Sequence, residues 1–533
     1  MIRSFFRSTI LALAALAAGS PLLAQPTSGG AAASTPPAAG TVVRPLASGA
    51  SPEPCALDDV SCSPPPLARE FRGLWIASVG NIDWPSRPGL PTDSAQLELR
   101  QLLDKAKATG LNAVILQVRP SGDALYASEL EPWSEYLTGQ QGVAPRPYWD
   151  PLKFAVDEAH ARGLELHAWF NPYRARHTSA KGALSPKHLA VARPSLVRNY
   201  GRQQWMDPGE VAVRAHTVRV IVDVVKRYDI DGVHIDDYFY PYKERDRSGR
   251  LVDFPDASTF RRYSMGGGTL ARDDWRRENV NALVSELYRS IHAEKPWVKF
   301  GVSPFGIWRP GFPETVVGFD AYNELYADAR KWLHEGWLDY FSPQLYWPVA
   351  QRGQEYPVLL RWWAEQNAFG RHLWPGNYTS KVGEQSRTAW RTSEIEAQIR
   401  LTRAEAGASG NVHFSAKAFL EDRDSLATRL GRHVYSAPAL VPPSPWLDVA
   451  PQGEPQLELR RSGTRVTLKV SPAGTESPQF WLVQTRRPDG SWHSSLMSGR
   501  VRELSVPAGA DRVAIRAVDR ASVEGPMIVL RVR

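Results

Sequence analysis

Between about residue 69 and residue 430, short apolar runs alternate with amphipathic segments. The runs are rich in β-branched and aromatic residues, which is typical of strands. Segments between them, such as residues 93–110 and 151–163, repeat apolar positions at helical spacing and end in glycine, a common residue at helix C-termini. The strand-like runs cover residues 71–78, 112–120, 164–173, 231–240, 298–306, 339–347, 372–379 and 411–419.

This alternation predicts a (β/α)8 TIM barrel over residues 67–436. The alternative is an open, doubly wound α/β sheet. Such a sheet usually has fewer strands, and no glycine-rich dinucleotide loop follows the first run here. We therefore favour the barrel.

The pattern changes after about residue 436. A proline-rich connection leads into short runs that alternate apolar and polar residues, and the sequence PDGSW at 488–492 is a hairpin turn signal. Residues 437–533 are predicted to form an all-β sandwich of the immunoglobulin or fibronectin III type. No catalytic constellation is found in this segment, so its expected role is spacing or binding.

The N-terminus carries an export pattern. Arg3 and Arg7 precede a short apolar run, and small residues before Gln25 predict a signal peptide over residues 1–24. The alternative is an uncleaved anchor, but the run is short for a membrane span. Residues 25–66 are rich in Ala, Pro and Ser and are expected to be a linker. The mature protein is then periplasmic or secreted, without stable membrane insertion.

Composition narrows the classes of molecule that the protein is expected to bind. Lys and Arg total 64 against 56 Asp and Glu, a mild net charge of +8, and no basic stripe or nucleic-acid motif is present. The 19 Trp are a stronger clue, because indole rings stack on sugar rings as well as filling cores. Cys55 and Cys62 could pair after export, as a local clip only.

The ends of the predicted strands carry the candidate chemistry, because TIM barrels build their active sites at the carboxyl ends of the strands. Acids, amides and aromatic residues gather there, which suggests a polyhydroxylated ligand. No motif for a cofactor, a metal or a phosphate competes, so none of these is expected. The candidate binding residues are Arg119, Asn171, Tyr173, Arg174, His234, Tyr238, Tyr240, Gln344, Tyr346, Trp347 and Asn377.

Strand parity orders the acids of the fourth run. If Val233 and Ile235 pack under the helices, His234 and Asp236 point into the barrel. Asp236 is therefore the principal catalytic candidate. Asp237 would point away, unless the strand has already ended, and is expected to orient its neighbour.

A second carboxyl group is normally needed for glycoside hydrolysis. The loops offer Asp123, Glu324 and Asp328, and of these Asp328 is included among the catalytic candidates. Asp328 could instead cap the helix that follows it. Assistance by an N-acetyl group of the substrate would remove the need for a second protein nucleophile.

Several motifs, in order, resemble the bacterial glycosyl hydrolase-like family ten. They are FRGLWIASVGNIDWPS, QVRPSGDALY, AWFNPYR, DGVHIDDYFYPY and YADARKWLHEGWLDYFSPQLYW. The resemblance implies a TIM barrel and glycosidase activity, and a family relative acts on peptidoglycan strands stripped of stem peptides. The fourth run is also similar to the chitinase motif DGxDxDxE, with one departure. Tyr238 stands where chitinases place their general-acid Glu, which leaves the proton donor open.

The sequence thus predicts an exported glycosidase that acts on peptidoglycan glycan strands. One alternative is a glycan-binding protein without activity, which would keep the aromatic residues and need no buried acid. Another is a metal-dependent deacetylase. His234 with Asp236 would leave the other metal ligands unnamed, so this reading is the weakest.

Overall fold

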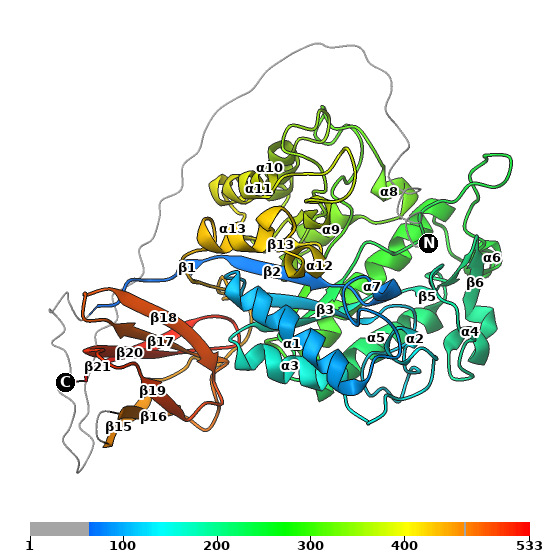
Figure 1. Cartoon of the computed structure of the whole chain (residues 1–533). Coiled ribbons are helices and arrows are strands. Elements are labelled where there is room, and N and C mark those ends of the chain that lie inside the picture. Colours follow the sequence, from blue (N-terminus) through cyan, green and yellow to red (C-terminus); the bar gives the residue numbers. More distant parts are fainter. Residues whose placement is uncertain (1–62, 463–464, 533) are drawn as a thin grey trace. The chain divides into compact units, whose positions relative to one another are not determined.

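The structure is a computed structural model that describes residues 63–462 and 465–532 (Figure 1). The predicted signal peptide, most of the predicted linker, and both cysteines lie outside these residues. Of the helices that the structure describes, none combines the length and the apolar character needed to cross a membrane.

Parallel strands close into a barrel, which confirms the predicted fold. Their bounds are β2 (Phe71–Ile76), β3 (Ala113–Arg119), β4 (Glu165–Phe170), β8 (Gly232–Ile235), β9 (Lys299–Val302), β10 (Tyr340–Phe341), β11 (His372–Leu373), β12 (Gly376–Asn377) and β13 (Gly410–His413). The sheet order is β11-β10-β9-β8-β4-β3-β2-β13-β12. Because only Trp374 and Pro375 separate β11 from β12, these two form one interrupted strand. It pairs with β10 at its start and β13 at its end, so the ring closes.

A helical segment follows each barrel strand (Figure 1). The principal helices are α1 (Thr92–Ala108), α3 (Pro151–Ala161), α5 (Val211–Arg227), α7 (Arg272–Glu294), α9 (Ala329–His334), α10 (Tyr356–Glu365), α11 (Thr392–Ala404), α12 (Ala416–Leu420) and α13 (Leu426–Arg432). Further helices are α2 (Glu135–Thr138), α4 (Leu189–Ala192), α6 (Ala257–Met265) and α8 (Ala321–Glu324). A small antiparallel sheet of β5 (Arg174–Arg176), β6 (Val197–Tyr200) and β7 (Gln203–Met206) stands after β4.

Local sequence explains where these helices begin and end. Asp150 caps α3 by accepting hydrogen bonds from the backbone N–H groups of Leu152 and Lys153, both at 3.1 Å. Gly163 follows the helix with φ of 70°, a conformation that favours glycine. The predicted helical segment at 151–163 is therefore confirmed to within its last two residues.

Aromatic rings fill the inside of the barrel, and glycines on neighbouring strands make room for them. Phe71 stacks on Trp374 with ring centroids 3.7 Å apart. A Cβ atom on Gly301 would lie 2.1 Å from the ring of Tyr340, and one on Gly232 would lie 2.5 Å from the imidazole of His167. The barrel interior is thus a packed core.

A row of hydrogen bonds also runs through this interior. Trp75 Nε1 donates to His234 Nε2 at 3.0 Å. The Tyr340 hydroxyl lies 3.1 Å from His234 Nδ1 and 2.9 Å from His167 Nδ1. His167 Nε2 lies 3.1 Å from a carboxylate oxygen of Glu165, which is the first residue of β4. The row therefore ends at the amino ends of the strands.

The C-terminal segment is an all-β sandwich, as predicted. Its strands are β15 (Gln456–Ser462), β16 (Arg465–Ser471), β17 (Phe480–Arg486), β18 (Trp492–Ser498), β19 (Glu503–Val506), β20 (Arg512–Val518) and β21 (Glu524–Arg531). They form two antiparallel sheets with orders β15-β16-β19 and β18-β17-β20-β21. The turn at 488–492 joins β17 to β18 as a hairpin. Before the sandwich, β14 (Ala439–Leu440) pairs with β1 (Ala68–Arg69).

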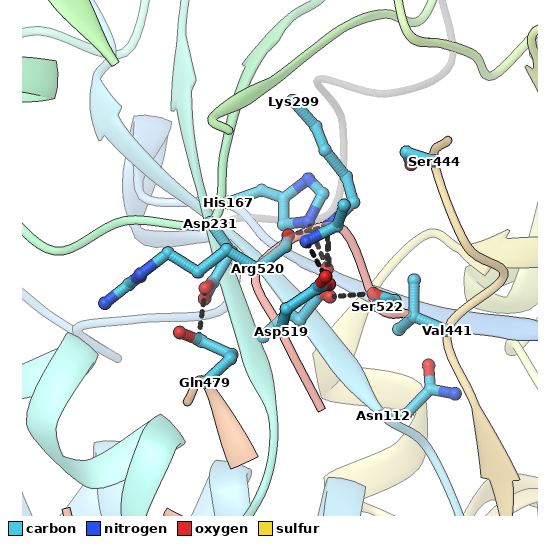
Figure 2. Close-up of polar contacts among 12 residues, drawn as sticks. Asn112, His167, Asp231, Lys299, Val441, Ser444, Gln479, Asp519, Arg520 and Ser522 are labelled. Carbon is cyan, nitrogen blue, oxygen red and sulfur yellow. Dashed lines mark hydrogen bonds and ion pairs between the residues drawn. The ribbon is translucent and has the colours of Figure 1, made fainter. Parts of the chain in front are cut away.

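The sandwich contacts the amino ends of the barrel strands, the floor of the barrel (Figure 2). Gln479 donates a hydrogen bond to Asp231, which precedes β8. Ser522 Oγ donates to Glu165 at 3.1 Å. Lys299 Nζ lies 3.1 Å from Glu165 and 3.4 Å from the carbonyl oxygen of Arg520. This floor is the opposite end of the barrel from Asp236.

Candidate active site

Asp236 lies at the carboxyl end of β8 and is only 4% exposed. Trp169 Nε1 donates to it at 3.1 Å, and Asn171 Nδ2 lies 3.2 Å from both of its oxygens. Trp169 is on β4, and Asn171 follows that strand directly. The backbone N–H of Tyr238 adds a donor at 3.3 Å. The neighbouring strand and the chain just beyond β8 therefore fix this carboxyl group.

Asp237 is equally buried and uses different partners. The Tyr242 hydroxyl donates to one of its oxygens, and Gln344 Nε2 donates to the other at 3.0 Å. Gln344 also donates to the carbonyl oxygen of Ser303, which ties the loops after β9 and β10 together. Because β8 ends at Ile235, strand parity does not extend to Asp237, and both acids are brought to the same strand end.

Burial and proximity govern the titration of the acid pair. Burial raises the pKa of Asp236 to about 6; the Arg174 guanidinium lowers this pKa, and the charge of Asp237 raises it. Burial also raises the pKa of Asp237, while the hydrogen bonds from Tyr242 and Gln344 lower it. Two interacting carboxyl groups lose their protons in two steps that belong to the pair. The pair can therefore hold one proton and one negative charge together.

Arg174 stands beside the pair. Asn171 Oδ1 accepts a hydrogen bond from the Arg174 backbone N–H at 2.8 Å, so the same amide positions both Arg174 and Asp236. The Arg174 guanidinium lies over the ring of Tyr238, 4.3 Å from its centroid, and 5.7 Å from that of Trp205. The NPYR turn after β4 thus delivers a cation to the acids.

Half-buried aromatic rings lie at the same strand ends. Tyr346 stacks on Tyr378 with ring centroids 4.9 Å apart. Besides burial, the charge of Asp237 helps to raise the pKa of both Tyr346 and Tyr238, so both hydroxyls lie near this acid. Trp347 packs edge-on against Phe305 at 5.6 Å. Flat apolar rings with polar edges are suited to contact with sugar faces.

Other predicted site residues face protein partners. Arg119 pairs with Glu131 at 2.5 Å and donates to the carbonyl oxygens of Asn171 and Pro172, so it supports the loop after β4. Asn377 is fully buried and donates to Gln398 at 2.8 Å. These residues hold the barrel wall together and make no contact with the acid pair.

Tyr173, Tyr240 and Asp328 also lie apart from the pair. The Tyr173 ring is fully buried in the main core, and Tyr240 packs against Tyr326 with centroids 4.9 Å apart. Asp328 caps α9 by accepting from the Lys331 N–H at 3.4 Å and from Trp308 Nε1 at 3.2 Å. The alternative capping role thus describes the observed contacts of Asp328.

His234 points into the barrel but lies in the layer beneath the acids, between Trp75 and Tyr340. Burial lowers its pKa well below the ordinary value, so it is neutral. In the described part of the chain, no group of three or more His, Cys, Asp or Glu side chains is arranged to hold a metal ion.

The predicted set omits Trp169 and Tyr242, although both hold the acids. Trp169 could have been included from parity, because it lies two residues after His167 on β4 and points to the same face. Tyr242 lies in an irregular segment beyond β8, where no periodic pattern indicates which aromatic residue turns back. Its contact with Asp237 depends on the path of that loop.

Comparison with known proteins identifies the family. The sequence matches the family described as "Glycosyl hydrolase-like 10" over residues 70–392, which confirms the resemblance. It is 40% identical over 442 residues to "Glycosyl hydrolase YngK" of Bacillus subtilis (strain 168), covering 81% of this chain and 85% of that one. It is 36% identical over 394 residues to "Glycosyl hydrolase DigH" of Escherichia coli (strain K12), covering 68% and 88%.

Among solved structures, the chain is similar to the PgaB (BpsB) glycoside hydrolase domain from Bordetella bronchiseptica. The TM-score is 0.45 at 13% identity, over 68% of this chain and 98% of that domain. The catalytic domain of β-amylase from Paenibacillus polymyxa gives a TM-score of 0.47 at 11% identity, over 70% and 99%.

Proposed function

The chain belongs to the glycosyl hydrolase-like 10 family, and from this membership we propose that it is a glycosidase with Asp236 and Asp237 at its catalytic centre. The observation that carries the proposal is the acid pair itself. Two adjacent carboxyl groups are buried at the carboxyl end of a barrel strand, each held by its own donors. A protein that only binds glycans has no need for a buried pair of this kind, because burying two like charges is costly.

The pair supports hydrolysis chemically. Cleavage of a glycosidic bond needs a proton for the leaving oxygen and a negative charge or nucleophile near the anomeric carbon. A pair that shares one proton provides both. We further propose that an acetamido group of the substrate acts as nucleophile, with one aspartate orienting it and the other donating the proton. The position of Tyr238, where chitinases have Glu, is consistent with moving the proton donor to the aspartates.

The proposed substrate is a peptidoglycan glycan strand without stem peptides, cleaved outside the cytoplasm. The family resemblance supports this substrate, and peptidoglycan sugars carry the N-acetyl groups that the mechanism uses. The half-buried rings of Tyr346, Tyr378 and Trp347 provide stacking surfaces near the acids. The export pattern of the first 24 residues supports a periplasmic or secreted location.

The test is incubation of the purified protein with intact peptidoglycan and with strands stripped of stem peptides, followed by mass spectrometry. We expect short oligosaccharides from the stripped strands, and the mass of their ends identifies the cleaved bond. Binding of stripped strands without any product would instead support the glycan-binding alternative. Release of acetate without chain cleavage would support the deacetylase.

A further inference from the structure

Arg174 is a buried cation that forms no ion pair within 4.0 Å, although its charge acts on Asp236 and Asp237 at longer range. It is 2% exposed, and its guanidinium donates a single hydrogen bond, from Nη1 to the carbonyl oxygen of Pro120 at 3.3 Å. Its Nε–H is buried and has no partner. A guanidinium offers five N–H donors, and leaving a buried charge unpaired is costly.

The other buried arginines of the described residues all pair with carboxylates. Arg72 binds Glu70 at 2.7 Å, Arg119 binds Glu131 at 2.5 Å, and Arg276 binds Asp256 at 2.7 Å. Arg277 binds Asp274 at 2.5 Å. Arg174 has no such pair within 4.0 Å, and in this it differs from the other four buried arginines.

The location of Arg174 suggests where its missing partner comes from. Its backbone N–H is held by Asn171, whose side chain also contacts Asp236, and its charge lowers the pKa of Asp236. Its guanidinium covers the half-buried ring of Tyr238. A glycan placed over the acid pair would therefore bring one of its substituents to this cation.

We propose that Arg174 binds a carboxylate substituent of the sugar at the acid pair, and thereby selects acidic sugars. The planar guanidinium matches a carboxylate through two parallel hydrogen bonds. This inference rests on the proposed function. In peptidoglycan the matching group is the lactyl carboxylate of the muramic acid residue, which is free on stripped strands and amide-bonded where a stem peptide remains.

The experiment compares two forms of one substrate. Stripped glycan strands are used directly, or after carbodiimide coupling of their carboxylates to methylamine, which makes each a neutral amide. We expect the wild-type kcat/KM to be about 10- to 100-fold higher on the free carboxylate, the range of hydrogen bonds to charged groups. Arg174→Gln should cleave both forms at similar rates. The ratio of the two rates does not depend on how much of the variant is folded.

Two further variants sharpen the assignment. Arg176 lies on the same strand, β5, and donates to the carbonyl oxygen of Gly182 at 2.7 Å, so Arg176→Gln should keep the wild-type preference. Arg174→Lys keeps the positive charge but loses the planar pair of N–H donors, so it should keep part of the preference for the free carboxylate. If Arg174→Gln proves insoluble, Arg174→Lys and the wild type still decide the question.

Two results would overturn the inference: equal wild-type rates on the two forms, or an unchanged ratio in Arg174→Gln. The second would show that Arg174 acts only on the charge of Asp236, because both substrates then slow alike. If the wild type cleaves neither form, the proposed function fails separately. Calorimetric binding of the same two forms to the wild type then tests Arg174, with tighter binding of the carboxylate expected and equal binding excluding it.

Discussion

At the scale of single residues, two neighbouring aspartates have different surroundings. Asp236 accepts hydrogen bonds from Trp169 and Asn171 of the preceding barrel strand and its loop, whereas Asp237 accepts from Tyr242 and Gln344. The first set comes from β4 and the residue after it, and the second comes from the segment after β8 and the loop after β10. The two carboxyl groups can therefore be perturbed one at a time.

Asparagine at either position keeps the shape and removes the charge. We expect Asp236→Asn to fold normally, to bind stripped glycan, and to lose at least ~100-fold in turnover, the scale of a lost acid–base group. Asp237→Asn should also lose activity, because it removes the second carboxyl group of the pair and its effect on the pKa of Asp236. Asp328→Asn is the matched control, since asparagine also caps helices and the Asp328 side chain accepts hydrogen bonds from α9 and Trp308. A fully active Asp236→Asn would move the chemistry to another strand end.

The raised pKa of Asp236 predicts a pH dependence. Asp236 holds its proton below about 6 and is ionised above about 6, where it can no longer act as the acid. We therefore expect kcat/KM to fall as pH rises through about 6, and Asp236→Asn to lack this limb in its residual activity. The measurement is kcat/KM from pH 4 to 8 on stripped strands. A rate that rises through the same range would mean that the ionised form of Asp236 is required.

Strand parity oriented the side chains within β8 but could not place those beyond Ile235, including Asp237 and Tyr242. Val233 and Ile235 are both fully buried on the helix side, as the alternation indicates, and His234 faces inward. Parity holds only within a strand, and β8 ends one residue before the acids. Similarly, nothing in the sequence near Arg119 shows that its guanidinium forms an ion pair with Glu131, twelve positions later. Such pairs depend on loop paths that no periodic pattern encodes.

At the scale of elements, the alternation of strand-like and helical segments was enough to predict the barrel. The observed strands are nevertheless shorter than the predicted ones. β10, β11 and β12 are two residues each. Pro343 and Pro375 lie inside the runs at 339–347 and 372–379 and cannot donate ladder hydrogen bonds, which accounts for the short pairing. The sequence pattern did not predict which glycines face the interior. Glycine is required at those positions because a Cβ atom would clash with a ring on the neighbouring strand.

Gly301 provides the test of that packing. A methyl group there would meet the Tyr340 ring at 2.1 Å, and that ring is fixed by hydrogen bonds to two histidines. We expect Gly301→Ala to lower the free energy of unfolding by about 1–3 kcal/mol, the usual cost of overpacking a core. Gly474→Ala is the control, since its added Cβ would meet nothing within 4 Å. Denaturant unfolding measures both, and equal midpoints would show that the barrel interior can yield.

At the scale of the whole molecule, the sandwich and its connection act on the barrel floor. Besides the contacts of Gln479 and Ser522, Trp446 Nε1 donates to Asp339 at 2.9 Å, and Ser444 Oγ lies 2.9 Å from His372 Nε2. Buried charges such as Glu165 and Lys299 would lose partners without them. The boundary near residue 436 remains a prediction, but these contacts link what lies on either side of it.

This linkage predicts that a change in the sandwich destabilises the barrel. Gln479→Ala removes a donor from the buried Asp231 and should lower the free energy of unfolding by about 1–3 kcal/mol, the cost of an unsatisfied buried group. Gln456→Ala, at an exposed position of β15, should have little effect. Thermal unfolding followed by tryptophan fluorescence is the measurement. An unchanged midpoint in Gln479→Ala would show that the two parts fold independently.

The row of hydrogen bonds through the barrel gives the protein a built-in spectroscopic reporter. Because His234 Nε2 accepts from Trp75, the imidazole proton of His234 sits on Nδ1, facing Tyr340. At His167, Nε2 faces Glu165, which can only accept, and Nδ1 faces the Tyr340 hydroxyl. Each ring nitrogen of the two histidines thus has a fixed partner, and ¹⁵N nuclear magnetic resonance distinguishes ring nitrogens that carry a proton from those that do not. Their imidazole signals would register, from inside the barrel, an event at either end: glycan arriving above Trp75 or the sandwich shifting beneath Glu165.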